Sequence, residues 1–80
     1  MEMDEFISNF AAQFNETDAQ AIEAGTRFHE IAEWSSIIAL SVIAMVDEEY
    51  QIKLRGEDLR AAETVEDIFC IVKERAAGNP

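Results

Sequence analysis

The stretch EWSSIIALSVIAMVDEEY, residues 33–50, decides the fold class. Two serines open a run that is apolar almost all the way round, and three acids close it. Within the run, apolar residues recur at the i, i+1, i+4, i+8 spacing of a buried helix face. These residues are Val42, Ile43, Val46 and Tyr50. The spacing predicts a helix from Ser36 to Tyr50.

Further segments on both sides carry helical patterns. Phe6, Phe10 and Phe14 recur at i, i+4 and i+8, which predicts a helix over residues 3–14 with an aromatic stripe in the core. A short helix is expected over residues 57–61. The last helix begins at Thr64, whose hydroxyl can cap it, with Asp67 three residues on as a variant capping box. Its expected buried stripe is Val65, Ile68, Phe69 and Val72.

Residues 15–35 have no sustained periodicity and predict a long connection with a turn or two of helix. Phe28, Ile31 and Trp34 give this connection apolar anchors, so we expect it to pack against the body of the protein. His29 has no cysteine or second histidine with which to share a metal, and we expect it to satisfy loop groups. The sequence therefore predicts an all-α fold: a small four-helix bundle of three main helices and one short helix, with a long first loop. We expect a single domain over residues 1–80.

Charge and cysteine content restrict the partners. Acids outnumber bases 17 to 6, for a net charge of −11, and a field of that sign repels nucleic acid and anionic lipid. A basic protein partner is the natural complement, although acidity alone also keeps a small protein soluble. Cys70 is the only cysteine, so we expect no internal disulfide and a cytoplasmic location. The longest apolar run, IIALSVIAMV, is too short to span a bilayer.

Catalytic patterns are absent from the sequence. One histidine and one cysteine do not make the usual zinc or nucleophile sites, and no glycine-rich phosphate loop occurs. Glu48 and Glu49 are adjacent on the predicted helix, so their carboxylates point in different directions. We therefore expect that the chain is not an enzyme.

The helix over residues 36–50 has more apolar surface than a small bundle needs. Ile37, Leu40 and Ala44 occupy one side of it, and Ile38 and Met45 occupy another. One possibility is that an apolar strip stays exposed beside the acids as a protein-docking surface. The other is that neighbouring segments bury the helix.

The serines at the start of this helix have two possible roles. Either Ser35 or Ser36 can cap the helix. A phosphate ester on Ser36 would lie beside free backbone N–H groups and the positive end of the helix dipole, and both favour an anion.

Residues 33–76, EWSSIIALSVIAMVDEEYQIKLRGEDLRAAETVEDIFCIVKERA, resemble the second half of an acyl carrier protein. The matching features are a Trp-x-Ser-apolar start, an apolar helix that ends in acids, Y-x-I-x-L followed by GEDL, and a closing T-V-x-D-I helix. The resemblance covers about residues 28–76 well, and the first helix agrees in type and length.

The resemblance implies a carrier with 4′-phosphopantetheine attached to Ser36 by a phosphopantetheinyl transferase. Ser36 takes this role because Ser35-Ser36-Ile37 aligns with the Asp-Ser-Leu motif of the family. The thiol of the arm would hold acyl intermediates as thioesters for fatty-acid, polyketide or related specialised acyl synthesis. The carrier is expected to be a monomer. The alternative is an unmodified carrier-like module that docks a partner through the acidic and apolar helix 36–50.

The resemblance also implies a docking face for acyl-transferring or acyl-synthesising enzymes with basic patches. Its apolar part is Ile37, Leu40 and Ala44, and its acids are Asp47 and Glu48. Three positions depart from the family pattern. Ser35 replaces the aspartate of the motif, and Ile38 and Ser41 stand where acids are common. These departures favour a specialised carrier.

Overall fold

The computed structural model describes residues 2–78 of the chain. Within these residues it contains α1 (Met3–Ala11), α2 (Ser36–Tyr50), α3 (Gly56–Ala61) and α4 (Val65–Ala76). Two single 3-10 turns, Ala19–Ala21 and Phe28–Glu30, lie in the long connection between α1 and α2. The prediction of an all-α bundle of three main helices and one short helix is confirmed, and the predicted helix over 36–50 has both of its ends correct.

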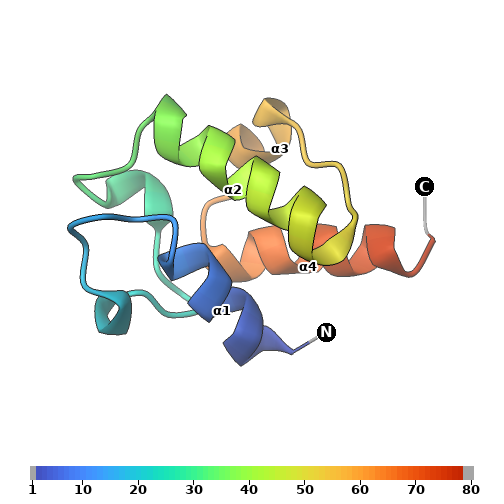
Figure 1. Cartoon of the computed structure of the whole chain (residues 1–80), viewed down its shortest axis with the longest axis horizontal. Coiled ribbons are helices and arrows are strands. Elements are labelled where there is room, and N and C mark those ends of the chain that lie inside the picture. Colours follow the sequence, from blue (N-terminus) through green and yellow to red (C-terminus); the bar gives the residue numbers. More distant parts are fainter. Residues whose placement is uncertain (1, 79–80) are drawn as a thin grey trace.

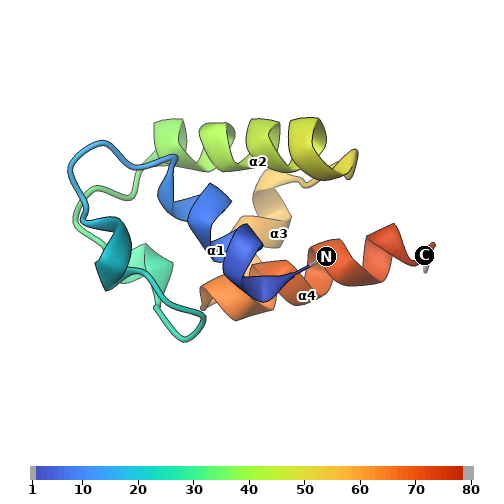
Figure 2. The ribbon, with the colours of Figure 1, turned by 60° about the horizontal axis from the view of Figure 1, so that its bottom comes forward.

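The four helices form one bundle, with the long first loop gathered at one end of it (Figure 1). Figure 2 shows α2 along one side and α4 along the other, with the short α3 between them. The radius of gyration is 11.5 Å, close to the value of about 11.6 Å expected for a compact chain of this length. α3 contacts both α2 and α4.

The core is built from the apolar stripes of the three main helices. The Phe6 ring lies 5.5 Å from the Phe69 ring and 5.9 Å from the Tyr50 ring, so that a single side chain joins α1, α4 and α2. The predicted stripes on α1 and α4 are buried as expected. Fully buried large side chains are Phe6, Phe10, Phe28, Val42, Val46, Val65, Ile68 and Val72.

The first helix is shorter than the sequence predicts, since it ends at Ala11 and not at residue 14. The chain tightens past Ala11 through i→i+3 hydrogen bonds from Gln13 N to Phe10 O and from Phe14 N to Ala11 O, each 3.1 Å. Beyond this turn, the backbone amides of residues 15–17 donate to the carboxylate of Glu33, which is described below. Phe14 is still buried, so the aromatic stripe continues past the end of the helix.

The long first loop is packed, as its apolar residues predict. Phe28 is completely buried, and its ring lies 4.8 Å from Trp34 and 5.9 Å from Phe10. The loop also pairs with the start of α4, where Val65 N donates to Thr26 O at 3.2 Å. The loop is thus a structural part of the bundle, held by contacts with α1 and with the start of α4.

The last helix has the predicted N-terminal capping box. Asp67 N donates to Thr64 Oγ1 at 3.2 Å, and Thr64 N donates to Asp67 Oδ2 at 3.0 Å. The pKa of Asp67 lies below its usual range, because its carboxylate accepts hydrogen bonds from the backbone amides of Thr64 and Glu63.

Of the helices in residues 2–78, none combines the length and apolar character that crossing a membrane requires.

Candidate functional site

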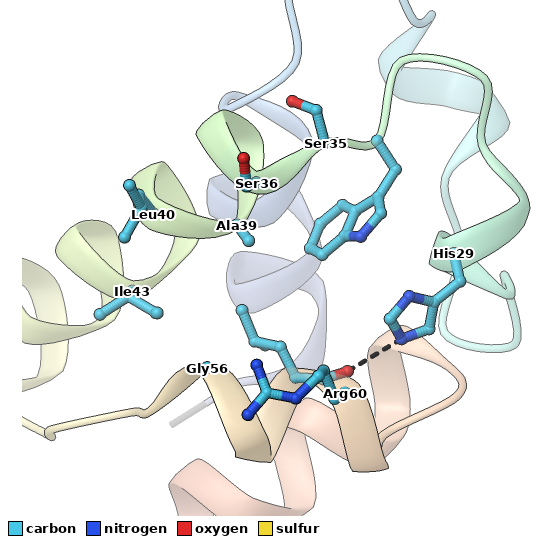
Figure 3. Close-up of a pocket in the computed structure, with 10 residues that line it drawn as sticks. His29, Ser35, Ser36, Ala39, Leu40, Ile43, Gly56 and Arg60 are labelled. Carbon is cyan, nitrogen blue, oxygen red and sulfur yellow. Dashed lines mark hydrogen bonds between the residues drawn. The ribbon is translucent and has the colours of Figure 1, made fainter.

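The two serines at the start of α2 have different roles in the structure. Ser35 is the N-cap: its backbone is extended, with φ −158° and ψ 174°, and its Oγ accepts a hydrogen bond from Ile38 N at 3.3 Å. Ser36 is the first helical residue, is exposed, and makes no side-chain hydrogen bond to any residue in 2–78. In Figure 3 its hydroxyl points away from α3, toward solvent. Of the two hydroxyls, that of Ser36 is the one left free.

The surroundings of Ser36 favour an anion. The first N–H groups of an α-helix have no acceptor within the helix and carry the positive end of its dipole. The first turn of α2 contains no acidic residue, although the chain as a whole is strongly acidic. A negatively charged group on the Ser36 hydroxyl would therefore lie beside backbone donors with no carboxylate in the same turn to repel it.

The predicted docking residues share one side of α2 with Ser36. At about 100° per residue, Ser36, Ile37, Leu40, Ala44, Asp47 and Glu48 fall within an arc of about 120°. Ile37 and Leu40 are 74% and 65% exposed, and Ala44 is exposed as well. An apolar strip is thus exposed on this side of the helix, which is the first of the two possibilities that the sequence left open.

The side of α2 that carries Ile38 and Met45, whose burial the sequence left open, is covered. Both side chains are buried in the core, together with Val42 and Val46. They lie on the opposite side of α2 from Ser36, where α1 packs against the helix. The buried face of α2 is therefore rotated toward Ile38 and Met45 relative to the predicted stripe, and Ile43 and Tyr50 of that stripe are only half-buried.

The two predicted docking acids differ in their surroundings. Asp47 Oδ2 accepts a hydrogen bond from Lys53 Nζ at 2.7 Å, so its charge is partly balanced within the chain. Glu48 is exposed and has no ion-pair partner in the described part of the chain. The last turn of α2 holds no basic residue, and both acids lie near the negative end of the helix dipole, where only Asp47 is paired, with Lys53 from the following segment.

A pocket of about 490 Å³ opens between α2 and α3 next to Ser36. This volume is within the range of about 300–1,000 Å³ typical of small-molecule sites. Its wall is mostly apolar, and Figure 3 shows Ala39 and Ile43 facing α3 across it. The lining residues are His29, Trp34, Ser35, Ser36, Ala39, Leu40, Ile43, Gly56, Leu59 and Arg60.

His29 holds the wall of the pocket that α3 provides. Its Nε2 lies 2.9 Å from Leu59 O and 3.0 Å from Ala62 O, and Figure 3 shows the contact to α3. Because carbonyl oxygens only accept, Nε2 carries the proton. The ring packs 4.3 Å from Phe28. The histidine therefore satisfies carbonyls at the end of a short helix, the role that the sequence predicted for it.

Glu33 fixes the segment that leads into Ser36. Its carboxylate accepts hydrogen bonds from Asn15 N at 2.6 Å, Glu16 N at 2.9 Å, and both Thr17 N and Thr17 Oγ1 at 2.8 Å. These bonds, that from Asn15 N above all, lower the pKa of Glu33 from its ordinary value of 4.5 to about 2. No local pattern in the sequence marks Glu33, because the amides that it binds lie 16 to 18 residues away in the chain.

The pocket residues other than Ser36 and Leu40 were also missing from the predicted site. Ala39 and Ile43 come from α2, while Leu59 and Arg60 come from α3. Only the packing of α3 against α2 brings them together, so no spacing in the sequence marks them. Cys70 is exposed and lies outside this site. Within residues 2–78 no three His, Cys, Asp or Glu side chains are grouped so that they could hold a metal ion.

Comparisons with protein families, with curated proteins and with solved structures found no match to this chain.

Proposed function

We propose that this protein is an acyl carrier protein that bears 4′-phosphopantetheine on Ser36. The observation that carries the proposal is the free, exposed hydroxyl of Ser36 at the first residue of α2, beside the mouth of an apolar pocket. The sequence resemblance of residues 33–76 to the family supports the same residue. In this proposal the chain is a cytoplasmic carrier and has no catalytic activity of its own.

The residues present fit the arm at both of its ends. At Ser36 the phosphodiester would lie against the first backbone N–H groups of α2. The transferase would form the bond from Ser36 Oγ to phosphorus as the pyrophosphate bond of coenzyme A breaks and adenosine 3′,5′-bisphosphate leaves, with the serine proton passing to a base of that enzyme. The thiol of the arm supplies thioester chemistry, and the pocket between α2 and α3 gives an apolar chain a place out of water.

Docking of partner enzymes would use the outer side of α2. Ile37 and Leu40 are large apolar side chains exposed next to Ser36, and such residues form the centre of protein interfaces. Asp47 and Glu48 lie two to three turns further along, at a helix end where a basic partner would relieve unfavourable charge. A partner that engages both groups would place its active site over Ser36, because all of them share one side of the helix.

The test is enzymatic loading followed by intact mass measurement. The protein is incubated with a broad-specificity phosphopantetheinyl transferase, coenzyme A and Mg²⁺, with Ser36→Ala and Ser35→Ala variants as a matched pair. We expect wild type and Ser35→Ala to gain the mass of one phosphopantetheine group, and Ser36→Ala to gain nothing. No gain in wild type, or a gain that survives Ser36→Ala, would refute the proposal.

The exposure of Ile37 and Leu40 also favours a second candidate, an unmodified module that binds a basic protein through α2. This candidate needs no group on Ser36. It predicts that Ser36→Ala leaves the function in cells intact, while Asp47→Lys abolishes it. The carrier predicts that Ser36→Ala abolishes function by itself. Measuring both variants in the native host separates the two candidates.

A further inference from the structure

Arg60 is the one cationic side chain that reaches the pocket between α2 and α3 with no carboxylate partner among residues 2–78. The acids nearest to it in sequence are each bonded to another cation. Asp58 accepts from Arg75 at 2.8 and 2.9 Å. Glu57 lies 3.6 Å from Arg55, and Glu63 lies 3.4 Å from Arg27. In a chain with 17 acids and 6 bases, an arginine left unpaired beside a pocket is available to an outside anion.

The sequence of α3 leaves room for this guanidinium. A Cβ placed on Gly56 would lie 3.3 Å from Arg60 Nη1, a tighter contact than side chains usually make. Gly56 does not adopt a positive φ, so the backbone does not require a glycine there. Figure 3 shows the Arg60 guanidinium next to Gly56 on the α3 side of the pocket. The glycine thus allows the arginine side chain to fold back along α3 at the pocket wall.

Apart from Arg60, the pocket offers little to a charged ligand. The hydroxyl of Ser35 is bonded to Ile38 N, that of Ser36 points outward, and Nε2 of His29 is bonded to carbonyls at the end of α3. An occupant would therefore be apolar along most of its length and would meet a single positive group. A planar guanidinium binds a carboxylate through two parallel hydrogen bonds.

We infer that the pocket selects an acyl chain that carries a carboxylate, which Arg60 binds. This inference rests on the proposed carrier function and adds the chemical class of the cargo to it. A plain alkyl chain would fill the apolar part of the pocket but would leave the guanidinium without a partner. A carboxylate at the far end of the chain satisfies both parts.

The test uses free thioesters, so that it does not depend on loading of Ser36. Unmodified, ¹⁵N-labelled protein is titrated with hexanoyl-pantetheine and with 5-carboxypentanoyl-pantetheine, which differ in the terminal carboxylate. The shifts of the amide signals of α2 and α3 give the two dissociation constants. We expect the carboxylate thioester to bind about five- to tenfold more tightly, the size of one charge-assisted bidentate contact that is partly exposed to water.

Two variants show whether Arg60 is responsible. Arg60→Gln should remove the preference, so that the two dissociation constants become equal within error. Lys73→Gln removes the same charge from α4, outside the pocket, and should preserve the preference. Equal binding of the two thioesters by wild type, or a preference that survives Arg60→Gln, would overturn the inference. A protein that loads Ser36 yet shows equal binding keeps the proposed function and loses only the cargo class.

Discussion

Glu33 holds Thr17 twice, because the same carboxylate oxygen accepts from the Thr17 backbone N–H and from its hydroxyl, both at 2.8 Å. With the amides of Asn15 and Glu16 on the same carboxylate, this contact joins the end of α1 to the segment that carries Ser36. A charged acceptor of several backbone amides is strongly favoured in its ionised form. The loop before the candidate site is therefore held by one ionised side chain.

Glu33→Gln is expected to destabilise the protein at neutral pH and to make its stability less dependent on acid. The pKa of Glu33 is lowered from 4.5 to about 2, so the folded state favours the ionised form. Its contribution is present above about pH 4.5 and is lost as the pH falls toward 2. Urea unfolding at several pH values measures this. Glu16→Gln, in the same loop, is the control, and equal pH profiles for Glu33→Gln and wild type would contradict the prediction.

Ser35→Ala should lower the stability of the protein by about 0.5–1 kcal/mol, because it removes the N-cap of α2. Ser35→Asp should keep the cap, since aspartate is an equally good N-cap residue. It also restores the acid of the family motif, so we expect faster loading of Ser36 by the transferase. Thermal unfolding and the time course of the mass gain measure the two effects. A slower loading of Ser35→Asp than of wild type would count against the carrier proposal.

Phe28→Ala should cost about 3–5 kcal/mol, even though Phe28 lies in the long loop. Its side chain is completely buried and contacts the rings of Phe10 and Trp34. Leu40→Ala, on the exposed side of α2, should change the stability by less than about 0.5 kcal/mol. Urea unfolding of both variants tests the contrast. Similar values for the two would mean that the loop does not contribute to the core.

Arg75→Lys should destabilise the protein nearly as much as Arg75→Ala, by about 1–2 kcal/mol. Arg75 binds both oxygens of Asp58 and also donates to Lys53 O at 2.9 Å, a geometry that an ammonium cannot reproduce. The contact lowers the pKa of Asp58 and raises that of Arg75. Thermal unfolding of the two variants and of Asp58→Asn measures it. Full stability of Arg75→Lys would show that charge alone is sufficient.

The elements predicted correctly are those that local chemistry determines. The helix over residues 36–50 has its cap and its apolar run within one segment, and the capping box of Thr64 and Asp67 spans only three residues. Such signals act between neighbours in the chain and need no knowledge of the fold.

The errors arise where distant segments meet. The length of α1 was predicted too long because the amides of Asn15, Glu16 and Thr17 bind Glu33, which no local pattern reveals. The sequence left open whether Ile38 and Met45 are covered, and they are buried in the structure, in a helix that α1 contacts. Burial depends on what lies opposite a residue, and periodicity identifies a face without identifying its neighbours.

The sequence by itself determined the helices, the presence of a serine cap at the start of the helix over residues 36–50 and the acidic charge, because propensity, capping and composition are properties of short segments. Only the tertiary structure decided that α3 packs beside α2 to form a pocket next to Ser36, and that Arg60 reaches this pocket without a carboxylate partner among the described residues. The reason is physical: a pocket exists only where two surfaces approach without filling the space between them. The side chains that line this space come from segments spread between residues 29 and 60, which only the fold brings together.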